Sequence, residues 1–162
     1  MPRVIILIGI PGSGKSSFVS NLVQSSATPI TVVSPDLIRC ELYGSSNIQG
    51  NWTEIYAQIK LQFQESYQEQ KSVIYDATNY RSHYRQEIIT LSKNIGFTSI
   101  TGIWLNVPLW ICLERNEHRT NPVPENIIME MYKTLMHRSP SLREGFDYLM
   151  IKEEGKFDDA LL

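Results

Sequence analysis

The chain has 162 residues, of which 42% are hydrophobic and 20% charged, and its formal net charge is −2. This balance argues against disorder, and the length predicts one domain over residues 1–162 that buries a core without disulfides. The charge does not indicate a general nucleic-acid-binding surface. Cys40 and Cys112 are too few for a disulfide framework or a zinc site, which favours a reducing, cytoplasmic compartment. No apolar run reaches the length of a membrane helix, so we expect no membrane partner.

Apolar, β-branched runs alternate with amphipathic segments along the whole chain. Strands are predicted at 4–8, 29–33, 73–75, 100–107 and 148–151. Helices are predicted at 15–24, 35–43, 52–63 and 84–95, with two more that begin near 108 and 124. Ser34 is the expected N-cap of the second helix, with Pro35 at its first position. The alternation predicts an α/β fold with a mostly parallel, five-stranded sheet between two layers of helices.

Residues 9–16, Gly-Ile-Pro-Gly-Ser-Gly-Lys-Ser, match the phosphate-loop (Walker A) pattern G-x-x-x-x-G-K-[ST] between a strand and a helix. The glycines let backbone N–H groups face phosphate oxygens, and the helix dipole favours an anion there. We expect Lys15 to reach the β- and γ-phosphates of ATP and Ser16 to bind Mg²⁺. The predicted ATP-binding residues of the loop are Gly9, Pro11, Gly12, Ser13, Gly14, Lys15, Ser16 and Ser17. A turn that binds nothing is the alternative, and the motif alone does not separate kinases from ATPases or GTPases.

Two acidic residues follow strands whose carboxyl ends lie beside the phosphate loop. Asp76 ends the 73–75 strand and is the expected second Mg²⁺ partner, with a plain turn residue as the alternative. Asp36 follows the 29–33 strand, where a carboxylate takes the proton of an attacking hydroxyl. Arg39 lies one turn further on the same face and suits a substrate phosphate or carboxylate. The alternatives are a helix-capping role for Asp36 and a surface ion pair of Arg39 with Glu41 or another neighbour.

The residues after Asp76 are candidates for substrate binding. Thr78 and Asn79 either contact substrate or cap the following helix. Arg81 and Arg85 are spaced to meet a phosphodiester backbone together, and solvated surface arginines are the alternative.

A polar helix end and a Pro-containing break predict a lid over about residues 112–126. Arg115 and Arg119 share one face of this helix end, and both are predicted to bind ATP. Arg119 is the candidate catalytic arginine, since a lid arginine can neutralise charge that develops during phosphoryl transfer. The alternative is a helical hairpin whose arginines pair with Glu114 and Glu117.

Several separated motifs together resemble P-loop kinases of the polynucleotide kinase type, in particular the 5′-kinase domain of the phage-type enzymes. They are the phosphate loop, Ser-x-Asp-x-x-Arg at 34–39, Asp-x-Thr-Asn at 76–79, Val-Pro at 107–108, Arg-Asn-x-x-Arg at 115–119, Val-Pro at 123–124 and Met-Tyr-Lys at 131–133. The chain departs from the phage pattern in a lid one residue shorter, in Thr120 where a glycine follows the lid arginine, and in an acidic residue displaced by one before the Thr-Asn pair. The accompanying 3′-phosphatase domain is absent from these residues.

The resemblance implies a P-loop NTPase fold of the nucleotide-kinase type, with ATP and Mg²⁺ as cofactors. Lys15 and Ser16 would hold the ATP phosphates and Mg²⁺, and Asp36 would be the general base on a 5′-hydroxyl. Arg39 would bind the 3′-phosphate of the acceptor, and Arg119 would be the lid arginine on ATP.

We therefore expect an ATP-dependent phosphotransferase that acts on the 5′-OH end of DNA or RNA. A small-molecule kinase acting on a sugar, a nucleoside or an antibiotic is the first alternative, which the acidic net charge favours. An ATP-binding regulatory module without an acceptor is the second.

Overall fold

The structure is a computed structural model that describes residues 1–154, so residues 155–162 of the predicted domain lie outside the described part. Its strands are β1 (Val4–Ile8), β2 (Ile30–Val33), β3 (Ser72–Tyr75), β4 (Ile100–Asn106) and β5 (Tyr148–Glu153). Its helices are α1 (Lys15–Ser25), α2 (Pro35–Tyr43), α3 (Trp52–Gln68), α4 (Ser82–Ile95), α5 (Leu109–Glu117) and α6 (Glu125–His137). A short 3₁₀ helix, η1 (Leu142–Glu144), precedes β5 and was not predicted from the sequence.

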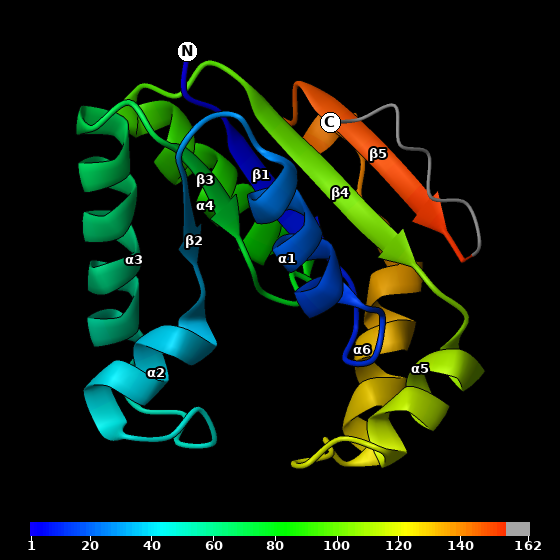
Figure 1. Ribbon diagram of the computed structural model, residues 1–162. Coiled ribbons are helices and arrows are strands. Elements are labelled where there is room, and N and C mark those ends of the chain that lie inside the picture. The colour runs from blue at the N-terminus through cyan, green and yellow to red at the C-terminus, as the bar shows by residue number, and fades with distance from the viewer. Residues whose placement is uncertain (155–162) are drawn as a thin grey trace.

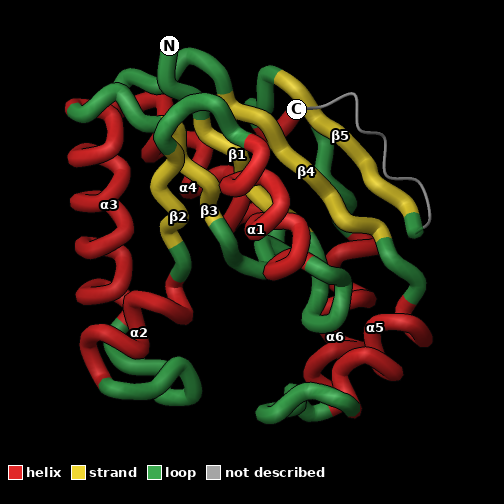
Figure 2. The backbone as a smooth tube through the Cα atoms, in the orientation of Figure 1, coloured by secondary structure: helices red, strands yellow, loops and turns green. Residues whose placement is uncertain are grey.

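The five strands form one sheet in the order β2-β3-β1-β4-β5 (Figure 1), and every neighbouring pair is parallel. The predicted sheet is therefore confirmed. Because the strands are parallel, their carboxyl ends lie at one edge, and the loops that leave this edge are neighbours in space. The tube in Figure 2 shows these loops leading into α1, α2, α4 and α5.

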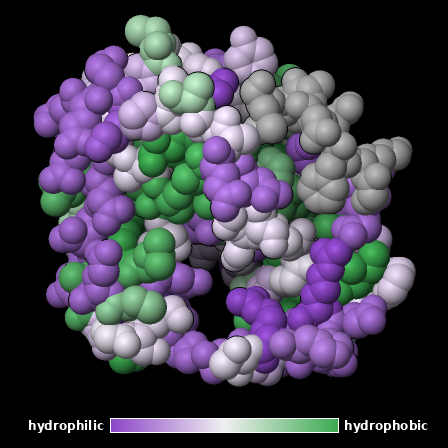
Figure 3. Space-filling model, in the orientation of Figure 1, coloured by the Kyte–Doolittle hydropathy of each residue, from purple (hydrophilic) through white to green (hydrophobic). Residues whose placement is uncertain are grey.

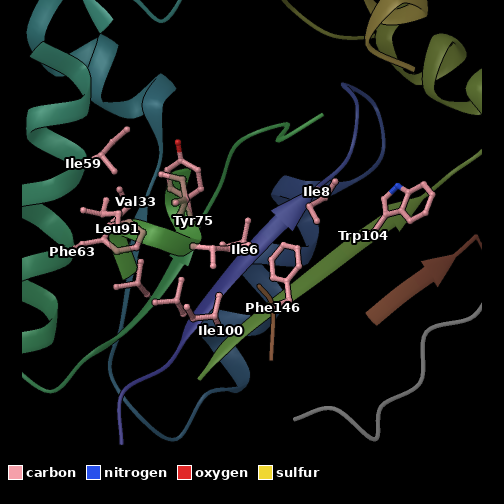
Figure 4. Close-up of a cluster of buried hydrophobic side chains, with 14 of the residues drawn as sticks. Ile6, Ile8, Val33, Ile59, Phe63, Tyr75, Leu91, Ile100, Trp104 and Phe146 are labelled. Carbon is pink, nitrogen blue, oxygen red and sulfur yellow. The ribbon is translucent and has the colours of Figure 1, made fainter. Parts of the chain in front are cut away.

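Helices cover both faces of the sheet, as predicted. On one face α1 packs Val19 against apolar side chains of the strands, including Leu7 and Ile74. On the other face α3, α4 and α6 cover a larger cluster (Figure 4), in which Phe63 lies edge-on to Tyr75. The continuous burial of β1 explains its purely aliphatic sequence, since a central parallel strand has no solvent-facing side.

The helix starts follow local chemistry at α2 but not at α4. The Ser34 hydroxyl accepts a hydrogen bond from the Leu37 N–H at 3.4 Å, and Pro35 lies in the first turn, which confirms the predicted cap of α2. The predicted capping of α4 by Thr78 or Asn79 is wrong. Arg81 is the N-cap of α4, and no side chain caps it.

Arg85 corrects a second prediction, because it is neither a surface arginine nor able to contact a phosphodiester backbone. Its side chain is 0% exposed and pairs with Glu144 through two nitrogens, Nε at 2.8 Å and Nη2 at 2.6 Å. Its guanidinium also donates to the carbonyls of Asn79 at 2.9 Å and Arg138 at 2.8 Å. The Ser82 hydroxyl donates to the same carboxylate at 2.6 Å. One buried ion pair thus joins the start of α4, the end of α6 and η1.

No helix among residues 1–154 has both the length and the apolar character needed to cross a membrane.

We predict that Glu144→Gln lowers the free energy of unfolding by about 3 kcal/mol, because it leaves the Arg85 charge buried without its counter-charge. Urea unfolding followed by circular dichroism would show a lower midpoint with an unchanged m value. The double variant Arg85→Met/Glu144→Leu removes both charges and is expected to lose less stability than the single variant. A Glu144→Gln protein as stable as the wild type would contradict this account.

Candidate active site

The phosphate loop, the start of α2, the end of β3 and the end of α5 converge at the carboxyl edge of the sheet. The space-filling view shows a hollow at this edge, below α1 and between α2 and the helices α5 and α6 (Figure 3). Lys15 lies within electrostatic reach of Asp76, Arg119 and Asp36. Four residues predicted from separate motifs are therefore brought together, although up to 104 positions separate them in sequence.

The phosphate loop has the backbone that its glycines predict. Gly12 and Gly14 have φ of 85° and 90°, a region that side chains disfavour, and Gly14 is the N-cap of α1 without a capping side chain. The first N–H groups of α1 therefore remain free to bind an anion. The Gly9 N–H donates to the Thr78 carbonyl at 3.0 Å, which joins the loop to the segment after β3.

The Lys15 ammonium folds back onto its own loop and donates to the carbonyls of Gly9 at 2.8 Å and Ile10 at 3.3 Å. Burial lowers the pKa of Lys15 from 10.5 to about 8; Asp76 opposes this shift and Arg119 adds to it. A lysine whose charge is so poorly solvated gains strongly from a bound anion. This is the property that a triphosphate site needs.

Asp76 and Ser16 are the two predicted Mg²⁺ ligands, and their surroundings can be compared with what this ion needs. Burial is the largest cause of the raised pKa of Asp76, Lys15 opposes it, and the Asp36 charge adds to it. The Asp76 side chain has no hydrogen-bond or ion-pair partner within 1–154, and Ser16 is exposed at the first turn of α1. No group of three metal-ligating side chains exists in this part of the chain. This set fits Mg²⁺, which is usually held by one or two protein oxygens together with substrate phosphates and water.

On the acceptor side, Asp36 and Arg39 form an ion pair with each other. Arg39 Nη1 lies 3.0 Å from Asp36 Oδ1, and Arg39 Nε donates to the Gln49 carbonyl at 3.3 Å. The Asp36 side chain is 74% exposed, whereas that of Arg39 is only 16% exposed. The expected alternative partner, Glu41, is not used. The carboxylate of Asp36 is thus accessible to a substrate, while the guanidinium of Arg39 is largely buried and held by the Gln49 carbonyl.

The predicted lid is the hairpin of α5 and α6. Asn116, which sequence reasoning passed over, is buried and exchanges two hydrogen bonds with the backbone of Val123, at 2.8 and 2.9 Å. Its position inside the Arg-Asn-x-x-Arg motif at 115–119 could have indicated that this asparagine matters for the lid. This clasp sets the turn that carries Arg119, an exposed residue with no ion pair among the described residues.

Arg115 does not pair with Glu114 or Glu117. It pairs instead with Glu154, Nη2 to Oε1 at 2.7 Å, and its Nη1 donates to the Gly12 carbonyl at 3.3 Å. The lid helix is therefore connected both to the phosphate loop and to the end of β5.

The predicted substrate residues after β3 have different surroundings. Thr78 is half-buried and contacts the phosphate loop through its carbonyl. Asn79 is buried with φ of 49°, and its Nδ2 donates to the Leu7 carbonyl at 2.7 Å, so the geometry gives this amide a positioning role. Arg81 is exposed and lies over the rings of Tyr80 and Tyr84.

We predict that Gly12→Ala weakens ATP binding more than about tenfold, or about 1.4 kcal/mol. An added Cβ would lie 2.3 Å from the Cys112 carbonyl oxygen, so the loop would have to move. Gly44→Ala is the matched control, because Gly44 has φ of 80° but nothing within 4 Å of its Cβ position. Titration of fluorescent ATP into both variants would measure the difference, and equal affinities would show that the loop does not need this close approach.

Comparisons with known proteins agree with this geometry. A family model described as an AAA domain matches residues 4–137. The chain is 30% identical over 138 residues to L-seryl-tRNA(Sec) kinase of Methanococcus maripaludis, covering 80% of this chain and 51% of that protein. It is 28% identical to transcription factor bHLH140 of Arabidopsis thaliana, covering 91% of this chain and 15% of that protein. The chain thus spans about half or less of the length of these relatives.

Solved structures share the fold. The Pnkp1/Rnl/Hen1 RNA repair complex matches with a TM-score of 0.76 at 20% identity, covering 90% of this chain and 46% of that chain. A gluconokinase from Sinorhizobium meliloti 1021 matches with a TM-score of 0.60 at 18% identity, covering 96% and 85%. The predicted resemblance to P-loop kinases is thereby confirmed. The chain belongs to the AAA domain family, in its P-loop kinase type.

Proposed function

We propose that this protein transfers the γ-phosphoryl group of ATP to the 5′-hydroxyl end of a DNA or RNA strand. The observation that carries the proposal is the convergence of Lys15, Asp76, Asp36 and Arg119 at one edge of the sheet. These residues supply a phosphate-binding cation, a metal-binding carboxylate, a base and a charge-neutralising arginine. The reducing environment favoured by the cysteines makes the cytoplasm the proposed compartment.

The residues would share the work of one displacement. Asp36 accepts the proton of the acceptor hydroxyl. At the same time the hydroxyl oxygen forms a bond to the γ-phosphorus, and the bond between the γ-phosphorus and the β-γ bridging oxygen breaks. The products are a phosphomonoester, ADP and the proton on Asp36. Lys15 and Arg119 stabilise the charge that develops on the phosphoryl oxygens. Bound Mg²⁺, held by Asp76 and Ser16, would supply further charge neutralisation.

The Asp36–Arg39 pair supports an anionic acceptor. The ion pair with Arg39 occupies one carboxylate oxygen of Asp36, the proposed base. A phosphate of the substrate would compete with this carboxylate for the guanidinium of Arg39. The phosphate on the 3′-oxygen of the 5′-terminal nucleotide would draw Arg39 from Asp36 and free the base for the 5′-hydroxyl. The names of a relative, L-seryl-tRNA(Sec) kinase, and of a protein of similar fold, an RNA repair complex, favour an acceptor that is part of a nucleic acid.

A small-molecule acceptor is the second candidate. The gluconokinase and a tunicamycin resistance protein from Deinococcus radiodurans share the fold, with TM-scores of 0.60 and 0.63. The net charge of −2 favours this candidate. A regulatory ATP-binding module is the third candidate, and it would not need Asp36.

We predict that the wild type transfers labelled γ-phosphate from ATP to a 5′-OH oligonucleotide, and that Asp36→Asn lowers kcat at least about 100-fold. ATP affinity should change little, since the carboxylate acts on the acceptor. Glu41→Gln is the matched control, because Glu41 is an exposed carboxylate on the same helix.

Labelling of a sugar, nucleoside or antibiotic in place of the oligonucleotide would favour the second candidate. ATP hydrolysis with no labelled acceptor, unchanged in Asp36→Asn, would favour the third. Full transfer by Asp36→Asn to every active acceptor would refute the role of the base.

A further inference from the structure

A separate cavity of about 260 Å³ lies between the first turns of α4 and the end of α6, which we call the α4–α6 pocket. Every residue that lines it is polar or basic, and the basic ones are Arg81, His83, His137 and Arg138. Its lining holds no carboxylate, although Glu130 on α6 is close enough to act on Arg81. In a chain of net charge −2, this local excess of positive charge selects for an anion.

The positive charges of the pocket are not neutralised within the protein. Neither Arg81 nor Arg138 forms an ion pair with any residue in 1–154. Arg81 is held in place by the Tyr80 ring, 5.3 Å from its guanidinium carbon, and its Nε donates to the Tyr80 hydroxyl at 3.2 Å. Its two terminal nitrogens remain available in the planar arrangement that suits phosphate oxygens.

The walls of the pocket are fixed from below by the buried Arg85–Glu144 pair. Arg85 binds the backbone carbonyl of Arg138, and Glu144 accepts the hydroxyl of Ser82, so both sides share one anchor. The N-terminus of α4 has no acidic residue in its first turn and no capping side chain, and its dipole adds positive potential. A preorganised site loses less side-chain entropy when a ligand binds.

The position of the pocket relates it to the acceptor side. Arg81 follows Asp76 by five residues, so their Cα atoms lie within ~17 Å of each other. Phosphates along one strand rise by ~3.4 Å per nucleotide, so a strand of a few nucleotides spans that distance.

We propose that the α4–α6 pocket binds a backbone phosphate of the acceptor strand, a few nucleotides away from the reacting 5′-end. This inference rests on the proposed function and extends it. It makes the acceptor a chain with several phosphates rather than a single nucleotide, and it adds Arg138, His83 and His137 to the residues that contact substrate.

The test compares two acceptors in three arginine variants. Arg138→Ala should raise the KM of a 5′-OH oligonucleotide of ten nucleotides about 3- to 10-fold, with kcat, the KM of ATP and the KM of a dinucleotide acceptor unchanged. The slope of log affinity against log salt should become shallower by ~0.7, the value for one phosphate contact on a single strand. Arg3→Ala removes the same charge before β1, at the amino edge of the sheet, and should change nothing. Arg138→Lys should restore most of the loss, and equal urea midpoints would show that the variants are folded.

An unchanged oligonucleotide KM in Arg138→Ala, or an equal effect on the dinucleotide, would overturn the proposal.

Failure of the proposed function is recognised separately, because the wild type would then phosphorylate no oligonucleotide. In that case fluorescence anisotropy of a labelled oligonucleotide decides. Wild-type binding that Arg138→Ala weakens would still support the pocket, and no binding would overturn it. Inorganic phosphate and sulfate are compared as competitors for the bound oligonucleotide. If phosphate displaces it only at the ionic strength at which sulfate also does, the site recognises a backbone phosphate. Tight binding of inorganic phosphate without oligonucleotide binding would point to a free phosphate-bearing metabolite and overturn it.

Discussion

The ammonium of Lys15 is held against the carbonyls of Gly9 and Ile10, where burial disfavours its charge, and this constraint determines how the rest of the site is organised. The positive φ of Gly12 and Gly14 allows the loop to curl around the lysine. Asp76 partly offsets the cost of the buried charge, and it is itself poorly solvated. The site thus holds opposite charges that are incompletely compensated by each other. A bound triphosphate with its metal would neutralise the remaining charge. The favourable energy of that neutralisation would contribute to the affinity for ATP.

A second buried charge pair, Arg85–Glu144, supports the structure around this site rather than its chemistry. It holds the segment after β3, whose Asn79 is fixed to β1 and whose Thr78 carbonyl binds the phosphate loop. The same pair holds the end of α6, the second helix of the lid. The phosphate loop and the α4–α6 pocket are therefore connected to this pair by hydrogen bonds. A change that loosens Glu144 is expected to disturb both.

Local patterns in the sequence predicted the strands, the phosphate loop and the start of α2, because each depends on residues a few positions apart. The aliphatic run of β1 and the Ser34-Pro35 cap are examples. What could not be predicted depends on distant partners. Arg85 looked like the surface neighbour of Arg81, because its partner Glu144 lies 59 positions away. Arg115 likewise has nearby acidic residues on its own helix but pairs with Glu154 at the end of β5. Asp36 and Arg39 were both predicted as site residues on one face of α2. The structure adds that they form an ion pair with each other.

The central claim is that burial lowers the pKa of Lys15 in the free protein and that bound phosphates raise it again. Calorimetry of ATP binding with Mg²⁺ in buffers of different ionisation heat measures the protons taken up. Because the pKa of Lys15 is about 8 in the free protein and rises when phosphates bind, uptake should grow from ~0.1 proton at pH 7 to more than ~0.5 at pH 9. Lys15→Met should bind ATP more weakly and take up almost none. Tight ATP binding at pH 9 without proton uptake, or equal uptake by Lys15→Met, would contradict the account.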